Sequence, residues 1–404
     1  MSIESFTHLA RLTGAVPPPA PGLYDGSWPG LLRRGLQIAV NAVELLRSRG
    51  TFVAVHGAGV PVAVGRVRAD EQLSVRALLS GSCILRDARL TILADRLAID
   101  RHTQLELFLA TEDVLVVFGE RSGAALAIHI SANEDHLSRQ RQGLETARQV
   151  LAKCHADNFI PRVIEWRRVD SAWALFQERL GGRTVNPARL SEQALEGYIE
   201  AALKPLLWLD SLAEPCDEGA DFQMIFDGLR NLESHSVLAA QITRPLAALR
   251  NWPERRHFRT VLAHGDYWFQ NLLFAEDDSA ALTGIIDWER CRMRALPGSD
   301  ALYLVVFGFS HWRGCPEFQV LCDLWDDRCE PFLRRLIERV CTVFRMSTDD
   351  LRFVAILIWL MHLRLRGPWM MEWPAAKHQE WITLPAASAG RWLSRIESFN
   401  RSHA

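Results

Sequence analysis

One stretch of the chain, residues 261–289, carries more polar residues than a protein core needs and constrains the fold most strongly. It contains the tripeptide His264-Gly265-Asp266, and Asn271 follows five residues after the aspartate. Two short apolar runs then frame a polar turn, which is the pattern of a β-hairpin. The second run ends directly before Asp287. The spacing therefore predicts that two carboxylates and one amide meet in a small space.

Residues of these types in this order suit phosphoryl transfer. Asp266, on a loop, can take the proton of an attacking hydroxyl. Asn271 and Asp287 offer the hard oxygen ligands that Mg2+ prefers, and Mg2+ bridges the phosphates of a nucleotide. The alternative is an ordinary hairpin with an N-capping aspartate and a buried His264, which accounts for fewer of the spaced elements.

The motif HGDxxxxNLL followed by IIDWE resembles the aminoglycoside phosphotransferase and choline kinase branch of the protein-kinase-like fold. The resemblance implies that Asp266 is the catalytic base and that His264, in the same loop, is also a catalytic residue. It also implies that Asn271 and Asp287 are the Mg2+ ligands.

Residues after the hairpin extend the resemblance. The family has a later aspartate that opens a helix and braces the catalytic loop from behind, and Pro297, Gly298 and Asp300 match that place. The helix is expected over residues 301–309, with Asp300 also serving as its N-cap.

Length and composition narrow the class of protein. A chain of 404 residues predicts two or three domains. A net charge of −2, without runs of like charge, argues against nucleic acid as the main partner. Eight scattered cysteines lack zinc spacing and indicate free thiols in a reducing compartment. We read no signal peptide and no transmembrane segment, so we expect a cytoplasmic protein.

Residues 95–182 show the element order of a kinase-like upper lobe. The expected order is three strands, a helix and two strands, at residues 104–109, 114–118, 125–130, 133–153, 159–164 and 172–180. By the resemblance, backbone groups near Gln177, Glu178 and Leu180 hold the adenine edge of the nucleotide. The alternative is an edge strand that runs into the turn at Gly181 and Gly182.

Two features depart from the family. The family places a lysine on the third strand, where it grips the phosphates and pairs with a glutamate on the next helix. Here His129 takes that position and Glu145 is the glutamate expected to face it, so the pKa of His129 should rise. The alternatives are a plain hydrogen bond between these two residues, or an arginine such as Arg121 or Arg139 on the phosphates.

The loop between the first two strands is the second departure. Residues 110–113 hold two acids and no glycine, and such a loop repels phosphate. Residues 1–94 lie outside the resemblance. We expect a helix over residues 31–49 and short strands at 52–55, 60–67, 74–79 and 89–93, either as an N-terminal extension or as part of an enlarged upper lobe. The turn at 56–61 is expected to be a plain hairpin turn rather than a phosphate loop.

Residues 183–404 are expected to form the lobe that carries the catalytic loop. The predicted helices lie at 191–212, 301–309, 317–345, 348–366 and 387–399. Tryptophans are frequent in the tail, where they either pack the core or wall a substrate pocket suited to sugars or cations.

The predicted fold class is α+β: a two-lobed protein-kinase-like fold, with a small β-rich upper lobe and a large, mainly helical lower lobe. The predicted function is Mg2+-dependent transfer of the γ-phosphate of a nucleotide, ATP as the first choice, to a hydroxyl of a small molecule. A sugar or sugar-containing metabolite is the first candidate acceptor, and a lipid or amino alcohol stays open. The alternative is a pseudokinase-like scaffold. The absence of the family's lysine and of its glycine-rich loop favours this alternative. Oligomeric state and ATP versus GTP are left open.

Overall fold

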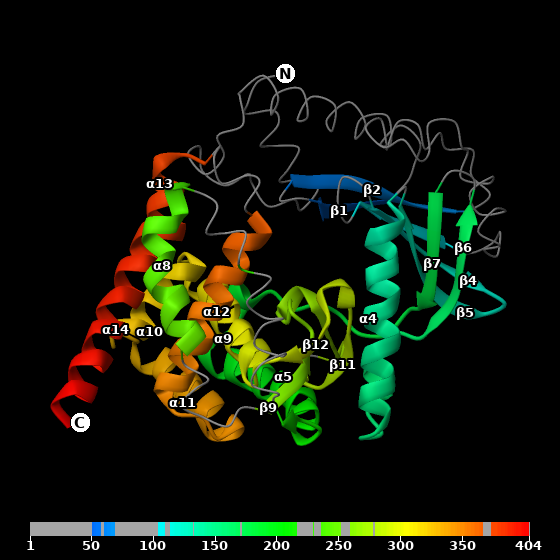
Figure 1. The fold of residues 1–404 in the computed structure, drawn as a ribbon. Helices are drawn as coiled ribbons and strands as arrows, with labels where there is room; N and C mark the ends of the chain where they lie inside the picture. The colour runs from blue at the N-terminus through cyan, green and yellow to red at the C-terminus, as the bar shows by residue number, and fades with distance from the viewer. Residues whose placement is uncertain are drawn as a thin grey trace. The chain divides into compact units, whose positions relative to one another are not determined.

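The computed structural model describes residues 51–57, 60–68, 104–109, 114–131, 133–169, 172–215, 229, 236–251, 259–277, 279–366 and 373–403 (Figure 1). They divide into two compact units. One contains the described residues up to Glu145 together with Pro161–Arg179, and the other contains Thr146–Ile160 and the residues from Leu180 onward. The helix predicted over 31–49, the strands predicted at 74–79 and 89–93, and the loop at 110–113 lie outside the described residues.

The first unit is built on a seven-stranded antiparallel sheet with the order β1-β2-β3-β4-β5-β7-β6. Its strands are β1 (Thr51–Gly57), β2 (Val60–Arg68), β3 (Gln104–Leu109), β4 (Val114–Arg121), β5 (Ala124–Ser131), β6 (Val163–Val169) and β7 (Ala172–Glu178). Because β2 pairs with β3, the described strands of the N-terminal region belong to the same sheet as the predicted upper-lobe strands. Ile128, Leu175 and Phe176 are fully buried at its centre.

The sequence predicts the helix and the strands of this unit, except that one strand begins several residues later than expected. Helix α4 (Glu134–Ala152) begins where Asn133 Oδ1 accepts the backbone N–H groups of Asp135 and His136, as an N-cap does. The strand predicted at 159–164 is instead β6, several residues later. A 3-10 turn at Asp157–Phe159 and the missing N–H of Pro161 keep the chain out of the sheet until Val163.

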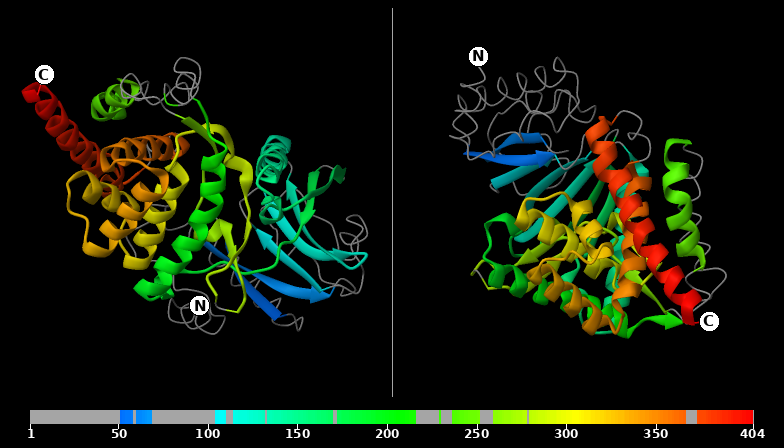
Figure 2. Two further views of the ribbon diagram at one scale, coloured as in Figure 1. Left: turned by 90° about the horizontal axis from the view of Figure 1, so that it is seen from below. Right: turned by 90° about the vertical axis from the view of Figure 1, so that its left-hand side faces the viewer.

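The second unit is mainly helical (Figures 1 and 2). Its helices are α5 (Glu192–Ser211), α8 (Ser236–Asn251), α9 (Ser299–Arg313), α10 (Glu317–Trp325), α11 (Pro331–Phe344), α12 (Thr348–Arg366), α13 (Ala375–His378) and α14 (Leu384–His403). The C-terminal helix α14 packs against α8 and α10 (Figure 2). No helix in the described part of the chain has the length and apolarity that a membrane span requires. The cysteines of the described segments all carry free thiols.

The single helix predicted over 317–345 is wrong, because α10 and α11 are separate helices. Asp327 has a left-handed backbone, with φ of 58°, which ends the first helix. Pro331 then occupies the first turn of α11, where its missing N–H costs no helical hydrogen bond.

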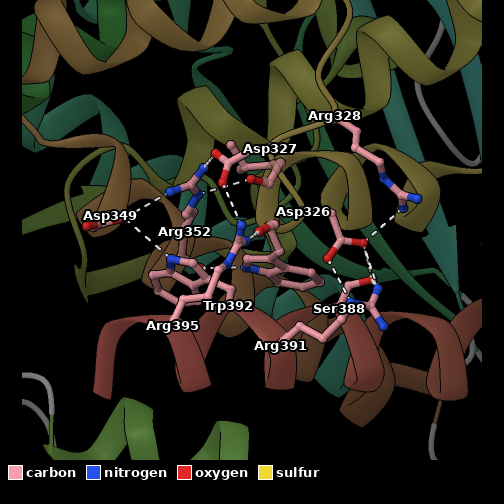
Figure 3. A network of polar contacts seen from close by, with 11 residues as sticks. Asp326, Asp327, Arg328, Asp349, Arg352, Ser388, Arg391, Trp392 and Arg395 are labelled. Atoms are coloured by element: carbon pink, nitrogen blue, oxygen red, sulfur yellow. Dashed lines mark hydrogen bonds and ion pairs between the residues drawn. The ribbon is translucent and has the colours of Figure 1, made fainter. Parts of the chain in front are cut away.

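A network of charged side chains fastens the end of α10 to α12 and α14 (Figure 3). Arg391 of α14 donates to Asp326, with Nη2 2.7 Å from Oδ2. Asp327 pairs with Arg352 of α12 and, at 3.0 Å, with Arg395 of α14. The two adjacent aspartates therefore tie three helices together at one point.

The pH dependence of stability tests this network. Burial of Asp326 opposes its ionisation, but hydrogen bonds from Arg391 and Ser388 outweigh burial and hold the pKa of this carboxyl below its usual 3.8. Such a group stabilises the fold above the pKa of the unfolded chain and loses that contribution as pH falls through the folded pKa. Asp326→Asn should lower the free energy of unfolding by about 1–2 kcal/mol at pH 7. The difference from wild type should shrink below about pH 4, and urea unfolding at pH 7 and pH 3 measures it. Equal stability at pH 7 would show that the network does not stabilise the fold.

Candidate active site

The predicted catalytic residues of the second unit lie at the ends of its short strands. β9 (Arg259–Ala263) ends directly before His264, and β11 (Leu282–Ile285) ends shortly before Asp287. β10 (Leu272–Phe274) pairs with β11 as the predicted hairpin, and β12 (Arg292–Ala295) pairs with β9. Four successive residues of β9, 260–263, are buried, so the strand anchors the loop that follows it.

Asp266 is held by its backbone and by its side chain. Asn271 Nδ2 donates to the carbonyl oxygen of Asp266 at 2.8 Å, so the two predicted residues lie together. Tyr303 Oη donates to Asp266 Oδ1 at 2.9 Å, and Arg290 Nη1 lies 3.4 Å from Oδ2. The Asp266 side chain remains 17% exposed, so it can be reached from solvent.

His264 is fully buried, and both of its ring nitrogens have partners. Nε2 lies 2.8 Å from the carbonyl oxygen of Ile286, and Nδ1 accepts the backbone N–H of Asp266 at 3.2 Å. A carbonyl only accepts, so Nε2 carries the proton and the ring is neutral. Burial lowers the pKa of His264, while Asp300 partly offsets the effect. We therefore assign His264 to holding the loop, in place of the catalytic role that the sequence suggested.

Asp300 holds the catalytic loop from the start of α9. Its Oδ2 accepts the backbone N–H of His264 at 2.6 Å, and its Oδ1 accepts that of Gly265 at 3.0 Å. The expected brace is present, but the expected N-cap role is wrong: the N-cap of α9 is Gly298, because both Asp300 oxygens turn to the loop. Gly265 has φ of 80°, and a Cβ there would collide with the carbonyl oxygen of Arg290. Only glycine suits this position.

Asp287 combines an unusual backbone with an unusual charge environment. Its φ of 64° is left-handed, a conformation that aspartate adopts more readily than most residues but that still costs energy. Burial, followed by the charges of Glu289 and Asp266, raises the pKa of the Asp287 carboxyl to about 7, and Arg290 offsets only part of this rise. A bound cation would relieve the crowding of these carboxylates.

Asn271 and Asp287 are the two side chains expected to bind Mg2+ through oxygen atoms. Within the described segments, no group of three His, Cys, Asp or Glu side chains is arranged to hold a metal ion. Mg2+ is usually held by one or two protein ligands, and substrate phosphates and water complete its shell. Asn271 and Asp287 match that number of protein ligands.

In the first unit, His129 and Glu145 do not pair as predicted. His129 Nε2 lies 2.8 Å from Gln177 Nε2, whose amide donates, so the imidazole is neutral. Burial, followed by His136, lowers the pKa of His129 to about 4, whereas a rise was expected. Glu145 is 55% exposed and lies beside Arg141, because α4 buries its Leu144 side against the protein. His129 is therefore uncharged between pH 6 and 8.5.

The strand expected to hold adenine lies inside the sheet. β7 pairs with β5 on one side and β6 on the other, so the alternative of an edge strand is wrong. The N–H of Glu178 donates to the carbonyl of Arg162 at 2.9 Å, and the side chain of Gln177 is engaged with His129. Leu180 begins the second unit. The role of these three residues toward the nucleotide stays a proposal.

Tyr303 and Arg290 contact the expected base, although the sequence motif does not include them. Tyr303 follows Asp300 by three residues, which places both on one face of α9. That spacing was available in the sequence. Arg290 is brought back to Asp266 by a short 3-10 turn, Trp288–Arg290, which has no evident sequence signature.

The brace by Asp300 leads to a prediction for stability. Asp300→Asn replaces one acceptor oxygen with a donor that faces a backbone N–H, so it should lower the free energy of unfolding by about 2–4 kcal/mol. Asp349→Asn is the matched control, since Asp349 is also in the first turn of a helix but is 55% exposed and pairs with Arg352. It should cost less than about 1 kcal/mol. Similar losses of stability in urea for both variants would contradict the brace.

The neutral state of His129 leads to a second prediction. The folded pKa of about 4 lies below the ordinary 6.5. The unfolded chain therefore binds a proton that the folded chain does not, and stability should fall as pH drops from about 6.5 to 4. His129→Gln should lose less stability over that range than wild type, in thermal unfolding at matched pH. An equal loss in the two proteins would mean that His129 is charged when folded.

Similar proteins are found among solved structures but not among curated proteins. Similar solved structures include a thermostable mutant of aminoglycoside phosphotransferase APH(4)-Ia with ADP and hygromycin B, with TM-score 0.49, 15% identity, and coverage of 76% of this chain and 97% of that one. Another is APH(3'')-Id from Streptomyces rimosus with ADP and streptomycin, with TM-score 0.42, 19% identity, and coverage of 64% and 92%.

The family itself is established by sequence. The model of the phosphotransferase enzyme family named APH matches residues 115–336, which is more than half of the chain. The match includes all but the first residue of β4, together with β5, the catalytic loop and α9. The predicted kinase-like fold and the predicted class of small-molecule kinase are thereby confirmed, and the chain belongs to the APH phosphotransferase enzyme family.

Proposed function

We propose that this protein transfers the γ-phosphate of Mg2+-bound ATP to a hydroxyl of a small molecule, with Asp266 as the base. The observation that carries the proposal is the close grouping of Asp266, Asn271 and Asp287. Asn271 donates to the carbonyl of Asp266, and the charge of Asp266 contributes to the raised pKa of Asp287. A purely structural hairpin has no need of this grouping.

The residues of the chain have distinct tasks in the proposed reaction. Asp266 takes the proton of the acceptor hydroxyl as its oxygen attacks the γ-phosphorus. Asn271 and Asp287 would hold Mg2+, which supplies positive charge to the phosphates when bound. His264 and Asp300 keep the loop in place through its backbone.

Arg290 is our candidate for the positive charge that the family takes from an upper-lobe lysine. His129, at that position, is neutral and bonded to Gln177. The Arg290 guanidinium lies beside Asp266 and 3.7 Å from Glu289, so it is already at the site. A planar guanidinium matches the oxygens of a phosphate well.

A sugar or sugar-containing metabolite remains the proposed acceptor, and aromatic side chains near the base support it. The ring of Trp268, two residues after Asp266, lies 6.1 Å from the buried ring of Phe307, centre to centre. Trp268 is partly exposed, whereas tryptophans such as Trp325 are core residues. Aromatic faces suit the apolar faces of sugar rings.

We also propose a cytoplasmic location, because free thiols persist in reducing compartments.

Nucleotide binding and turnover can be tested separately. A nucleotide at 100 times its dissociation constant stabilises a protein by about 2.7 kcal/mol, so Mg-ATP should raise the melting temperature of wild type. Asp266→Asn should keep this shift and lose turnover by ~10²–10⁴-fold. Asp287→Ala should lose the part of the shift that depends on Mg2+. Mg-GTP is measured in parallel to decide between nucleotides. Wild-type turnover in Asp266→Asn, or no shift with either nucleotide, would refute the proposal.

A further inference from the structure

One face of helix α9 contacts three consecutive residues of the catalytic loop. Asp300 binds the backbone N–H groups of His264 and Gly265. One helical turn later, Tyr303 Oη donates to the Asp266 carboxylate at 2.9 Å. The same helix therefore fixes both the backbone of the loop and the side chain at its end.

Tyr303 is itself held firmly in place. Its ring stacks on Phe307, one turn further along α9, with centres 4.1 Å apart and planes at 20°. Phe307 is buried. Burial, followed by the charge of Asp266, raises the pKa of Tyr303 well above its ordinary value, so the hydroxyl keeps its proton and acts as a donor. A rigid donor next to a carboxylate limits how that carboxylate can rotate.

The two oxygens of Asp266 are held unequally. Oδ1 accepts the Tyr303 hydroxyl at a normal hydrogen-bond length. Oδ2 faces Arg290 Nη1 at 3.4 Å, which is longer than the usual 2.7–3.2 Å for an N–H to oxygen bond. Oδ2 is therefore the oxygen with more capacity to accept a further hydrogen bond.

We propose that Tyr303 is a positioning residue that fixes the Asp266 carboxylate so that Oδ2 receives the acceptor's proton. The proposal rests on the proposed function, because it presupposes Asp266 as the base. In this step the O–H bond of the acceptor breaks and its proton passes to Oδ2. The acceptor oxygen forms a bond to the γ-phosphorus. The bond from that phosphorus to the bridging oxygen breaks, and its electron pair leaves with the nucleoside diphosphate. Tyr303 keeps its own proton throughout.

A double-mutant cycle separates positioning from general support of the fold. The four proteins are wild type, Tyr303→Phe, Asp266→Asn and the double variant. The probe is Mg-ATP with water as the acceptor, and inorganic phosphate is measured with enzyme in excess over nucleotide and, separately, in the steady state. Tyr303→Phe should lower kcat about tenfold with KM for Mg-ATP unchanged, because a misdirected base affects only the chemical step. With Asp266→Asn already present, Tyr303→Phe should lower the rate no further, since there is no base left to position.

Tyr267→Phe is the matched control. Tyr267 is also buried, and its hydroxyl donates to the carbonyl of Ala202 at 2.7 Å rather than to the base. It should lower the melting temperature, and any effect on the rate should be the same with and without Asp266→Asn. If Tyr303→Phe costs equally in both backgrounds, its role is structural and the positioning proposal is wrong. If Asp266→Asn alone turns over like wild type, the proposed function fails instead.

Discussion

The rest of the site depends on one interaction: the buried carboxylate of Asp300 accepts hydrogen bonds from the backbone of the catalytic loop. It accepts the N–H groups of His264 and Gly265, two donors that the strand before them does not satisfy. Burying a carboxylate is costly unless it is hydrogen-bonded, and here both oxygens are used. The loop can therefore leave β9, turn at a glycine with positive φ, and present Asp266 in one orientation.

The same loop is linked to the hairpin that carries the second acid. His264 donates to the carbonyl of Ile286, the residue before Asp287, and accepts from the N–H of Asp266. Only a neutral imidazole with the proton on Nε2 can make both bonds. Burial keeps the ring in that state. The expected base, Asp266, and the expected Mg2+ ligand, Asp287, are thus linked by hydrogen bonds through His264. Asp287 has a left-handed backbone, and the negative charges of Glu289 and Asp266 lie close to it. Strain and raised pKa values together are typical of functional sites.

Much of this local chemistry could be predicted from sequence, because the catalytic loop, the hairpin and the start of α9 are close in the chain. Their spacing constrains them to one place. The relation between His129 and Glu145 could not be predicted, since it depends on the rotation of α4 about its axis, and packing of Leu144 decides that rotation. The break between α10 and α11 was missed because apolar periodicity continues across it, while the left-handed Asp327 interrupts the backbone. Tyr303 could have been found from its three-residue spacing to Asp300, whereas Arg290 depends on a turn without a clear pattern.

The central proposal is that Asn271 and Asp287 are ligands of a Mg2+ ion that arrives with the nucleotide. A crystal structure of the protein with Mg2+ and a non-hydrolysable ATP analogue tests this most directly. Oxygen atoms of both side chains should lie about 2.0–2.1 Å from a Mg2+ ion that also contacts the phosphates. The Asp266 carboxylate should face the γ-phosphate without binding the metal. A nucleotide bound with its metal away from Asn271 and Asp287 would contradict the account.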